Sequence, residues 1–486
     1  MTLKENIKLM FNTFLFYQNI GDADKHYNLA QEKLDYLHKE IMHNPLSENW
    51  QDITQFFVQN SSFSTMSFTS VNNLKKMAVQ RAEILRRYLL NNGFQFDQPF
   101  PPGTGKIRLG IIREHYTTSS ETFASLPIFE CLNRDQFEIY LYSYETHTCP
   151  IEKYCRSCAD QFILLPREIG IQVQILRHAN LDILFFASNL NSALNRATTV
   201  LAMNRLARVQ VNSICSPFTT GMNTIDYYLS GNLLTPLPDY QVQYHEKLIN
   251  IEGSGICFQF PTSDTLTDFN RNRQDWHASK ETIIFISGSN FHKIIPEVRY
   301  AWAEIIANTK NSILVMYPFN PVNWGAYGIA QLFIDEMKSI FSQYGIHESR
   351  LIIEDPLPSI AAVRALLRLA DIYLDSFFYS GATSLIDPLS VGLPPVEYEG
   401  NALRFRQGAA MLREIDLSDL IVKDTKNYVK LAIDLANNYQ KRAYFRNQII
   451  TKMQNNTPFL NSRLFAQKIT NLFQSIVKEE RTSRKQ

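Results

Sequence analysis

The turn Gly381-Ala382-Thr383-Ser384 is the segment of this sequence best suited to binding a phosphate group. It follows Ile372–Leu374, an apolar stretch that is typical of a buried strand and leads into Asp375. The residues after it predict a helix that begins at Thr383. The backbone N–H groups at a helix start are unpaired and the helix dipole is positive there, so they attract an anion. An ordinary helix cap, in which the hydroxyls only close the helix, fits the same residues.

A lysine in a second polar turn provides positive charge for the same ligand. Asn290 and Lys293 follow a predicted strand at 282–287. A lysine placed there reaches the cleft beyond the strand ends and neutralises a leaving diphosphate without a metal ion. The alternative is a solvated loop lysine, which is the common fate of a single lysine.

A third loop, after the strand predicted at 106–112, offers groups for proton transfer. It carries Glu114, His115 and Glu121, and we expect Glu114 and His115 to serve in catalysis. The alternative for His115 is a solvated loop histidine with no chemical role.

Short apolar strands that alternate with helices position these loops. The first set of predicted strands is 106–112, 137–142, 181–186 and 208–213, and the second set is 282–287, 312–317, 350–353, 372–374 and 395–398. Such alternation predicts parallel sheets covered by helices on both faces. The fold class is therefore α/β, with two doubly wound, Rossmann-like domains that bind ligands beyond the carboxyl ends of their strands.

Changes in composition along the chain predict the domain boundaries. Residues 1–98 have helical periodicity with few glycines or prolines, and Pro99–Gly105 reads as a linker that cannot continue a helix. The expected domains are a helical N-terminal domain at 1–98, Rossmann-like domains at 106–260 and 280–460, and a final helix and tail at 461–486, with a polar hinge at 261–280. We expect the helical domain to dock on the first Rossmann-like domain.

In their order along the chain, these motifs resemble the bacterial branch of the O-linked N-acetylglucosamine transferase/SPINDLY family, which has the GT-B fold. The matching segments are Leu374-Asp375-x5-Gly381-x-Thr383-Ser384-x2-Asp387, Asn290-x2-Lys293-Ile294-x-Pro296, Pro217-Phe218-Thr219-Thr220-Gly221 and Tyr244-x-Glu246-Lys247-Leu248. The likeness runs in the same order through residues 106–475 of the chain, as a divergent member of that family.

The resemblance implies an inverting glycosyltransferase that moves N-acetylglucosamine or glucose from a UDP-sugar donor to a hydroxyl of a protein acceptor, with no cofactor and no metal. It implies that Lys293 is catalytic and binds the diphosphate. The residues expected on the nucleotide-sugar side are Asn290, Lys293, Leu357, Ser359, Gly381, Ala382, Thr383, Ser384 and Asp387, and those on the acceptor and sugar side are Ser119, Pro217, Thr219 and Thr220.

The chain departs from the family at three histidine positions, where it has Ser119, Val363 and Ala382. Two alternatives therefore stay open. One is a transferase with another donor or acceptor, such as GDP-fucose or a glycan. The other is a non-catalytic protein that binds a nucleotide sugar or a partner.

Composition excludes several other classes. The chain has 486 residues, 45% of them hydrophobic and 20% charged, and a formal net charge of +1. That balance gives no reason to expect a nucleic-acid partner. No apolar run approaches the ~20 residues of a membrane span, so we expect a cytoplasmic protein. Cys155 and Cys158 form a C-x-x-C motif, but no second pair stands at zinc-site spacing.

Overall fold

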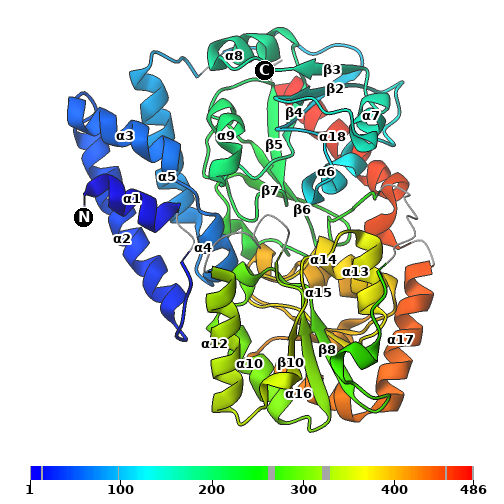
Figure 1. Ribbon diagram of the computed structural model, residues 1–486. Coiled ribbons are helices and arrows are strands. Elements are labelled where there is room, and N and C mark those ends of the chain that lie inside the picture. The colour runs from blue at the N-terminus through cyan, green and yellow to red at the C-terminus, as the bar shows by residue number, and fades with distance from the viewer. Residues whose placement is uncertain are drawn as a thin grey trace.

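The computed structural model describes residues 2–12, 15–96, 98–260, 269–319, 329–454 and 457–483. Two Rossmann-like domains lie one above the other, and the helical segment, residues 2–98, runs along one side of the molecule (Figure 1). This arrangement confirms the predicted α/β class and the GT-B type of architecture.

Within the described residues, the first Rossmann-like domain has a seven-stranded sheet in the order β3-β2-β1-β4-β5-β6-β7, with every neighbouring pair parallel. The strands are β1 (Ile107–Arg113), β2 (Phe137–Ser143), β3 (Gln161–Leu164), β4 (Ile183–Phe186), β5 (Val209–Ser213), β6 (Tyr227–Gly231) and β7 (Lys247–Ile251). Its helices are α6 (Ser120–Ser125), α7 (Pro150–Ser157), α8 (Ile169–His178) and α9 (Arg196–Ala202). The predicted strands are confirmed, whereas β3, β6 and β7 were not predicted.

The second Rossmann-like domain repeats the design with a six-stranded parallel sheet, again counted over the described residues, in the order β10-β9-β8-β11-β12-β13. The strands are β8 (Ile283–Ser287), β9 (Ser312–Met316), β10 (Leu351–Ile353), β11 (Ile372–Leu374), β12 (Pro395–Tyr398) and β13 (Ile421–Val422). Its helices are α10 (Pro296–Ala307), α12 (Ile329–Gln343), α13 (Ile360–Leu367), α14 (Thr383–Ser390), α15 (Gln407–Glu414), α16 (Thr425–Asn437) and α17 (Tyr439–Gln454).

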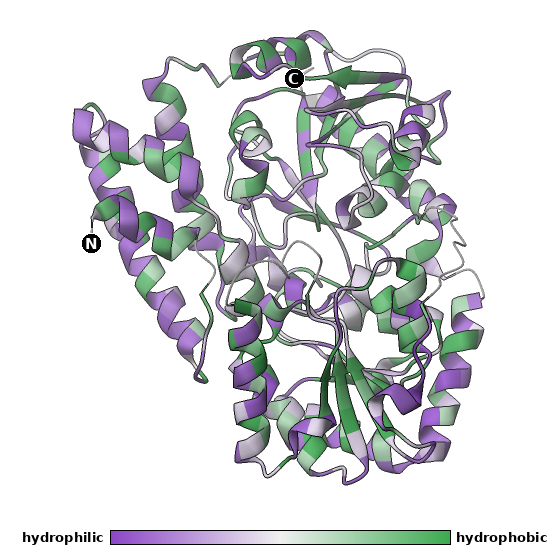
Figure 2. Ribbon diagram, viewed as in Figure 1, coloured by the Kyte–Doolittle hydropathy of each residue, from purple (hydrophilic) through white to green (hydrophobic). Residues whose placement is uncertain are grey.

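Both sheets are hydrophobic along their strands, while polar residues gather on the outer faces of the helices (Figure 2). Leu109 pairs with Ile139 on one side and with Ile183 on the other, and all three side chains are fully buried. Continuous apolar strands of this kind need helices on both faces, which is why the sheets are parallel and enclosed.

The helical segment comprises α1 (Leu3–Phe11), α2 (Asp22–His43), α3 (Glu48–Asn60), α4 (Ser64–Thr69) and α5 (Lys75–Asn91). Buried arginines attach it to both Rossmann-like domains. Arg81 donates to the Leu190 carbonyl of the first domain at 2.9 Å. From the second domain, Arg299 donates to the Tyr17 carbonyl at 2.9 Å and Arg404 to the Ser70 carbonyl at 2.9 Å. The expectation of docking on the first domain is therefore incomplete, because the segment also contacts the second.

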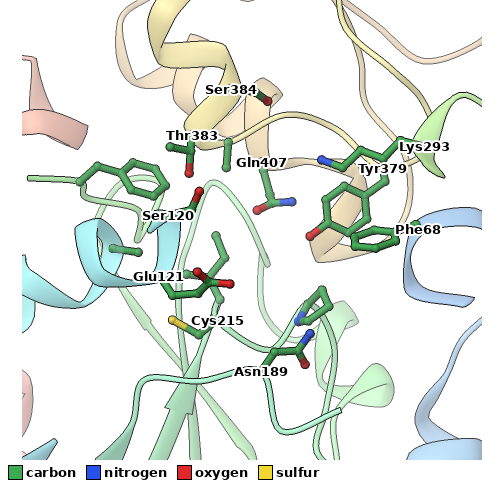
Figure 3. A pocket seen from close by; sticks show the side chains of 15 residues that line it. Phe68, Ser120, Glu121, Asn189, Cys215, Lys293, Tyr379, Thr383, Ser384 and Gln407 are labelled. Carbon is green, nitrogen blue, oxygen red and sulfur yellow. The ribbon is translucent and has the colours of Figure 1, made fainter. Parts of the chain in front are cut away.

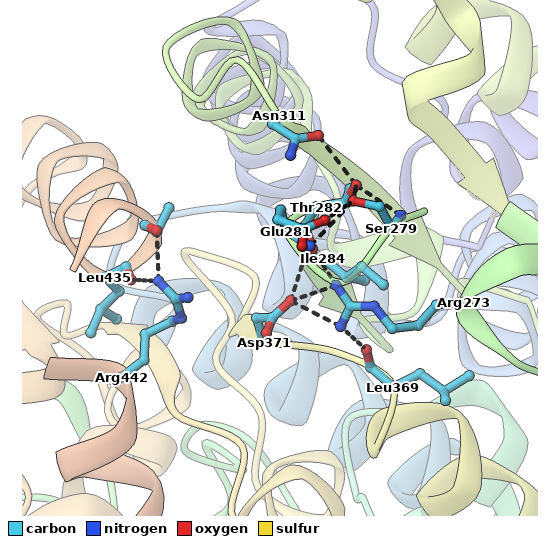
Figure 4. Close-up of polar contacts among 11 residues, drawn as sticks. Arg273, Ser279, Glu281, Thr282, Ile284, Asn311, Leu369, Asp371, Leu435 and Arg442 are labelled. Carbon is cyan, nitrogen blue, oxygen red and sulfur yellow. Dashed lines mark hydrogen bonds and ion pairs between the residues drawn. The ribbon is translucent and has the colours of Figure 1, made fainter. Parts of the chain in front are cut away.

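The connection between the Rossmann-like domains is partly fixed to the second sheet. The expected hinge, residues 261–280, begins at residues that lie outside the described ranges. Arg273, in its described part, contacts the second domain. Its guanidinium lies 3.3 Å from an oxygen of Asp371 and donates to the Leu369 carbonyl at 2.9 Å (Figure 4). The same Asp371 oxygen accepts the Ile284 backbone N–H at 2.9 Å, so the connection is tied to the amino end of β8. Arg442 caps the end of α16 nearby through the Leu435 carbonyl at 2.7 Å.

The last helix, α18 (Ser462–Ser483), leaves the second domain and packs on the first, near β7. An ion pair of 3.2 Å joins Arg481 to Asp182, so the last turns of the helix are fixed to the first domain. In the part of the chain that the structure describes, no helix is long and apolar enough to cross a membrane.

Candidate functional site

A pocket of about 330 Å³ opens between the carboxyl ends of the two sheets (Figure 3). All three parts of the molecule contribute to it: Phe68 from the helical segment; Ser120, Glu121, Ala124, Asn189, Ile214, Cys215, Pro217 and Phe258 from the first Rossmann-like domain; Lys293, Tyr379, Ala382, Thr383, Ser384 and Gln407 from the second. The predicted Lys293, Ala382, Thr383, Ser384 and Pro217 are thus brought together. Parallel α/β sheets bind ligands at this edge.

Lys293 ends a short 3₁₀ helix, η5 (Phe291–Lys293), that follows β8. Asn290 positions this helix by accepting the His292 backbone N–H at 3.1 Å, so Asn290 supports Lys293 and does not itself line the pocket. The Lys293 ammonium lies 4.2 Å from the centre of the Tyr379 ring. Burial lowers the pKa of Lys293 to about 8, while the carboxyl groups of Asp375 and Glu397 act in the opposite direction. Lys293 is therefore a half-buried cation of the pocket and not a solvated loop lysine.

The turn after β11 is fixed by the buried carboxylate of Asp375. An oxygen of Asp375 accepts the Gly381 backbone N–H at 2.6 Å. A Cβ atom on residue 381 would stand 2.7 Å from the Ser384 hydroxyl oxygen and 3.1 Å from an Asp375 oxygen, so a larger residue would have to displace these side chains. α14 begins at Thr383, and no side-chain hydrogen bond caps it at Ala382. The ordinary-cap interpretation is therefore wrong, and the start of α14 keeps its capacity for an anion.

A second buried acid lies next to Asp375. Burial and the adjacent Asp375 raise the pKa of Glu397 well above its usual range, and burial raises the pKa of Asp375. A Cβ atom on residue 408 would lie 2.5 Å from the Glu397 carboxyl group, so Gly408 provides the space for this side chain. Both carboxyl groups favour the charged form of Lys293.

Glu121 is the one carboxylate among the described side chains that line the pocket. It stands on the first turn of α6, where the helix dipole favours a negative charge, and its side chain is exposed to the cavity. Figure 3 shows Glu121 beside Cys215, on the wall opposite Lys293 and Thr383. Burial, opposed by Arg113 and assisted by Glu121, raises the pKa of Cys215 to about 11, so that thiol stays protonated near neutral pH.

Glu114 and His115, the expected proton-transfer residues, lie outside the pocket lining. Glu114 accepts the Ser188 hydroxyl at 2.6 Å and also the Thr198 hydroxyl, so its carboxylate is used within the first domain. Nδ1 of His115 lies 2.8 Å from the Thr117 hydroxyl. The loop does reach the pocket, but through the residues that follow, since the chain turns into α6 at Ser120.

Of the residues expected on the acceptor side, one lines the pocket and three support the loops around it. Pro217 lines the pocket, whereas Thr219 and Thr220 are fully buried and donate their hydroxyls to the Glu246 carboxylate. Ser119 caps α6 by accepting the Thr122 backbone N–H at 3.2 Å, which positions Glu121 two residues later. These three hydroxyl residues therefore hold the loops that form the wall.

On the nucleotide side, five expected residues lie beyond the pocket lining: Asn290 and Gly381, described above, and Leu357, Ser359 and Asp387. Ser359 caps α13 by accepting the Ala362 backbone N–H at 3.1 Å, and Leu357 packs half-buried against the core. Asp387 forms an ion pair of 2.9 Å with Arg364, which joins α14 to α13. Burial raises the pKa of Asp387, and Arg364 opposes that change. Contact of these residues with a nucleotide stays a prediction.

Nine lining residues were not predicted, among them Phe68, Asn189, Tyr379 and Gln407. Tyr379 stands inside the motif around Gly381, so its place in the turn was a usable signal. Phe68 gave none, because it belongs to a short helix far away in the sequence.

Comparisons with known proteins agree with this geometry. The sequence pattern of glycosyl transferase family 41 matches residues 262–469. The probable UDP-N-acetylglucosamine–peptide N-acetylglucosaminyltransferase SPINDLY of Oryza sativa subsp. japonica is 31% identical over 275 residues, which cover 54% of this chain and 26% of that protein. The corresponding probable transferase SEC of Arabidopsis thaliana is 22% identical over 348 residues, which cover 70% of this chain and 34% of that protein. The chain thus spans about a third or less of the length of these relatives.

A solved structure extends the likeness to almost the whole fold. A mutant of the Thermobaculum terrenum O-GlcNAc transferase superposes with a TM-score of 0.74 at 19% sequence identity, over 93% of this chain and 82% of that one. Residues 262–469 therefore carry a glycosyl transferase family 41 domain, and the chain is similar in sequence and fold to the O-linked N-acetylglucosamine transferase/SPINDLY-like members of that family.

Proposed function

We propose that this protein transfers a sugar, N-acetylglucosamine or glucose, from a UDP-sugar donor to a hydroxyl of a protein acceptor, with inversion at the anomeric carbon. One observation carries the proposal. The pocket sets a lysine and an uncapped helix start, both suited to a diphosphate, opposite a single carboxylate from the other domain. The names of the rice and Arabidopsis relatives supply the donor and acceptor classes.

Lys293 and the start of α14 bind the diphosphate and stabilise the charge that develops on it. The acceptor oxygen forms a bond to the anomeric carbon while the bond from that carbon to the diphosphate oxygen breaks. UDP leaves with the bonding electron pair. Preorganised charge of this kind is typically the largest contribution to such catalysis.

Glu121 accepts the proton that the acceptor hydroxyl loses. Inversion requires the acceptor to approach from the side opposite the leaving group, and Glu121 stands on the wall opposite Lys293. The two residues belong to different domains, so the cleft brings acid–base chemistry and leaving-group stabilisation together only when both domains are in place.

The positive charges provided by Lys293 and the helix start take the part that a divalent cation plays in other transferases. We therefore propose metal-independent transfer, which should proceed unchanged in EDTA.

Calorimetry with UDP, GDP, UDP-N-acetylglucosamine, UDP-glucose and GDP-fucose, followed by a radiolabel transfer assay with and without EDTA, tests the proposal. We expect UDP and a UDP-sugar to bind and label to reach protein. Binding of GDP-fucose alone would assign another donor. Binding of a UDP-sugar without transfer or hydrolysis would indicate a non-catalytic binding protein.

A further inference from the structure

We propose that Phe68 and Tyr379 form an aromatic wall against which the transferred sugar of the donor packs, so that the helical segment helps to select the sugar. This inference rests on the proposed function. Phe68 belongs to α4 and Tyr379 to the turn after β11, and their ring centres lie 4.9 Å apart in an edge-to-face arrangement. Figure 3 shows both rings beside Lys293.

The wall stands where a donor sugar must lie. The Lys293 ammonium is 4.2 Å from the centre of the Tyr379 ring and 6.0 Å from that of Phe68. The sugar is bonded directly to the diphosphate that Lys293 is proposed to bind. The Phe68 and Tyr379 rings therefore lie next to the position of the sugar. The acceptor approaches from the side of Glu121, which is farther from these rings.

The chemistry of the wall suits a sugar ring. Aromatic faces pack against the apolar C–H face of a pyranose, while a few polar groups fix its hydroxyls. Gln407, which is largely buried at the start of α15, lines the same part of the pocket. Burial raises the pKa of Tyr379 to about 12, so its phenol stays protonated and can donate a hydrogen bond.

Phe68 is held rigidly although it comes from a helix of only six residues. Just after α4, the buried Arg404 donates to the carbonyls of Ser70 at 2.9 Å and Asn72 at 2.8 Å. Just before α4, the Phe63 backbone N–H donates to the Asn191 carbonyl of the first domain at 2.9 Å. α4 is thus fixed to both Rossmann-like domains, and the Phe68 ring also packs near His292 of η5, at 6.5 Å between ring centres. A rigid support of this kind is what a specificity residue needs.

The experiment compares UDP, UDP-N-acetylglucosamine and UDP-glucose by calorimetry in wild type, Phe68→Ala and Phe68→Leu, with thermal melting alongside. UDP reports on the diphosphate and nucleoside sites, since it lacks the transferred sugar. We expect Phe68→Ala to weaken a UDP-sugar roughly 3- to 10-fold, to change the ratio between the two sugars, and to leave UDP binding unchanged. Phe68→Leu, which keeps bulk without the ring, should show a smaller change in the same direction.

Phe16→Ala is the matched control. Phe16 is also a half-exposed phenylalanine of the helical segment that packs on a cation of the second domain, with Arg299 4.4 Å from its ring centre, but it lies outside the pocket lining. It should leave both UDP and UDP-sugar affinity unchanged. Equal losses of affinity for UDP and UDP-sugar in Phe68→Ala would contradict the proposal that the aromatic wall packs against the sugar. Unchanged UDP-sugar affinity would contradict it as well. Failure of the wild type to bind UDP and the UDP-sugars would instead overturn the proposed function.

Discussion

Lys293 is the residue on which the proposed chemistry depends most. Replacing it by alanine should reduce single-turnover transfer roughly 10²- to 10³-fold, because one preorganised charge on the leaving diphosphate is lost. Transfer of a radiolabelled sugar measures this, and thermal melting checks the fold. Lys310→Ala, at an exposed lysine of the same domain, is the control and should be silent. Near-normal transfer by Lys293→Ala would remove Lys293 from the catalytic site.

The lowered pKa of Lys293 predicts how nucleotide binding depends on pH. Lys293 is charged below about pH 8 in the free protein and loses its proton above that value. UDP binds the charged form, so UDP affinity should fall as the pH rises from 7 to 9.5. UDP itself is fully ionised over this range, since a terminal phosphate has a second pKa of about 6. Lys293→Arg, whose guanidinium does not titrate here, should show a flat profile. A wild-type profile that is equally flat would contradict the assignment.

Glu121 and Glu114 offer a direct comparison between a carboxylate in the pocket and one outside it. Glu121→Gln should lower kcat roughly 10²- to 10⁴-fold with UDP affinity retained, because the amide cannot accept the acceptor proton. Glu114→Gln, at a carboxylate that accepts hydrogen bonds from Ser188 and Thr198, should lower the melting temperature and leave kcat nearly unchanged. Steady-state kinetics and calorimetry on both variants separate the two roles. A larger loss of kcat in Glu114→Gln than in Glu121→Gln would assign the role of general base to Glu114 instead.

At the scale of a single element, the turn between β11 and α14 is proposed to bind the diphosphate through its backbone N–H groups. Gly381→Ala should weaken UDP binding about tenfold, or about 1.4 kcal/mol, because the added Cβ would stand 2.7 Å from the Ser384 oxygen and displace the turn. Thr383→Ala and Ser384→Ala should each cost less, since the backbone N–H groups of the helix start remain. Calorimetry with UDP gives the ranking. A larger loss in the two hydroxyl variants would show that the side chains, and not the backbone, hold the phosphate.

At the scale of the whole molecule, the helical segment should behave as part of one body. The linker after it is itself clamped, because Arg208 donates to the Pro101 carbonyl at 3.0 Å. Buried Arg404 and Arg299 each bond to carbonyls of the helical segment. Limited proteolysis between residues 99 and 105 should therefore be slow, and the two fragments should elute together from a sizing column. Fragments that separate and each melt cooperatively would show independent domains.

Local patterns of the sequence determined most of the fold. Strands such as Ile372–Leu374 and Pro395–Tyr398 were placed at their observed bounds, because a buried parallel strand is a short apolar run that its own residues define. The edge strand Gln161–Leu164 was missed, although Phe162, Ile163 and Leu164 form a short apolar run that was a usable signal. The family resemblance then gave the order of the turn before Thr383 and of Lys293, and the structure brings Lys293, Thr383 and Ser384 into one pocket.

Only the tertiary structure decided which side chains of those loops face the cleft. The sequence indicates that a polar loop follows a strand, but the direction of each side chain depends on the neighbour that satisfies it. The hydroxyls of Thr219 and Thr220 donate to Glu246 and so turn away from the pocket. Glu114 accepts the hydroxyls of Ser188 and Thr198. Glu121 is the carboxylate that lines the described part of the pocket. Phe68 reaches the site solely because the helical segment packs across both Rossmann-like domains. Contacts between residues so distant in sequence are set by the packing of whole elements, which no local pattern encodes.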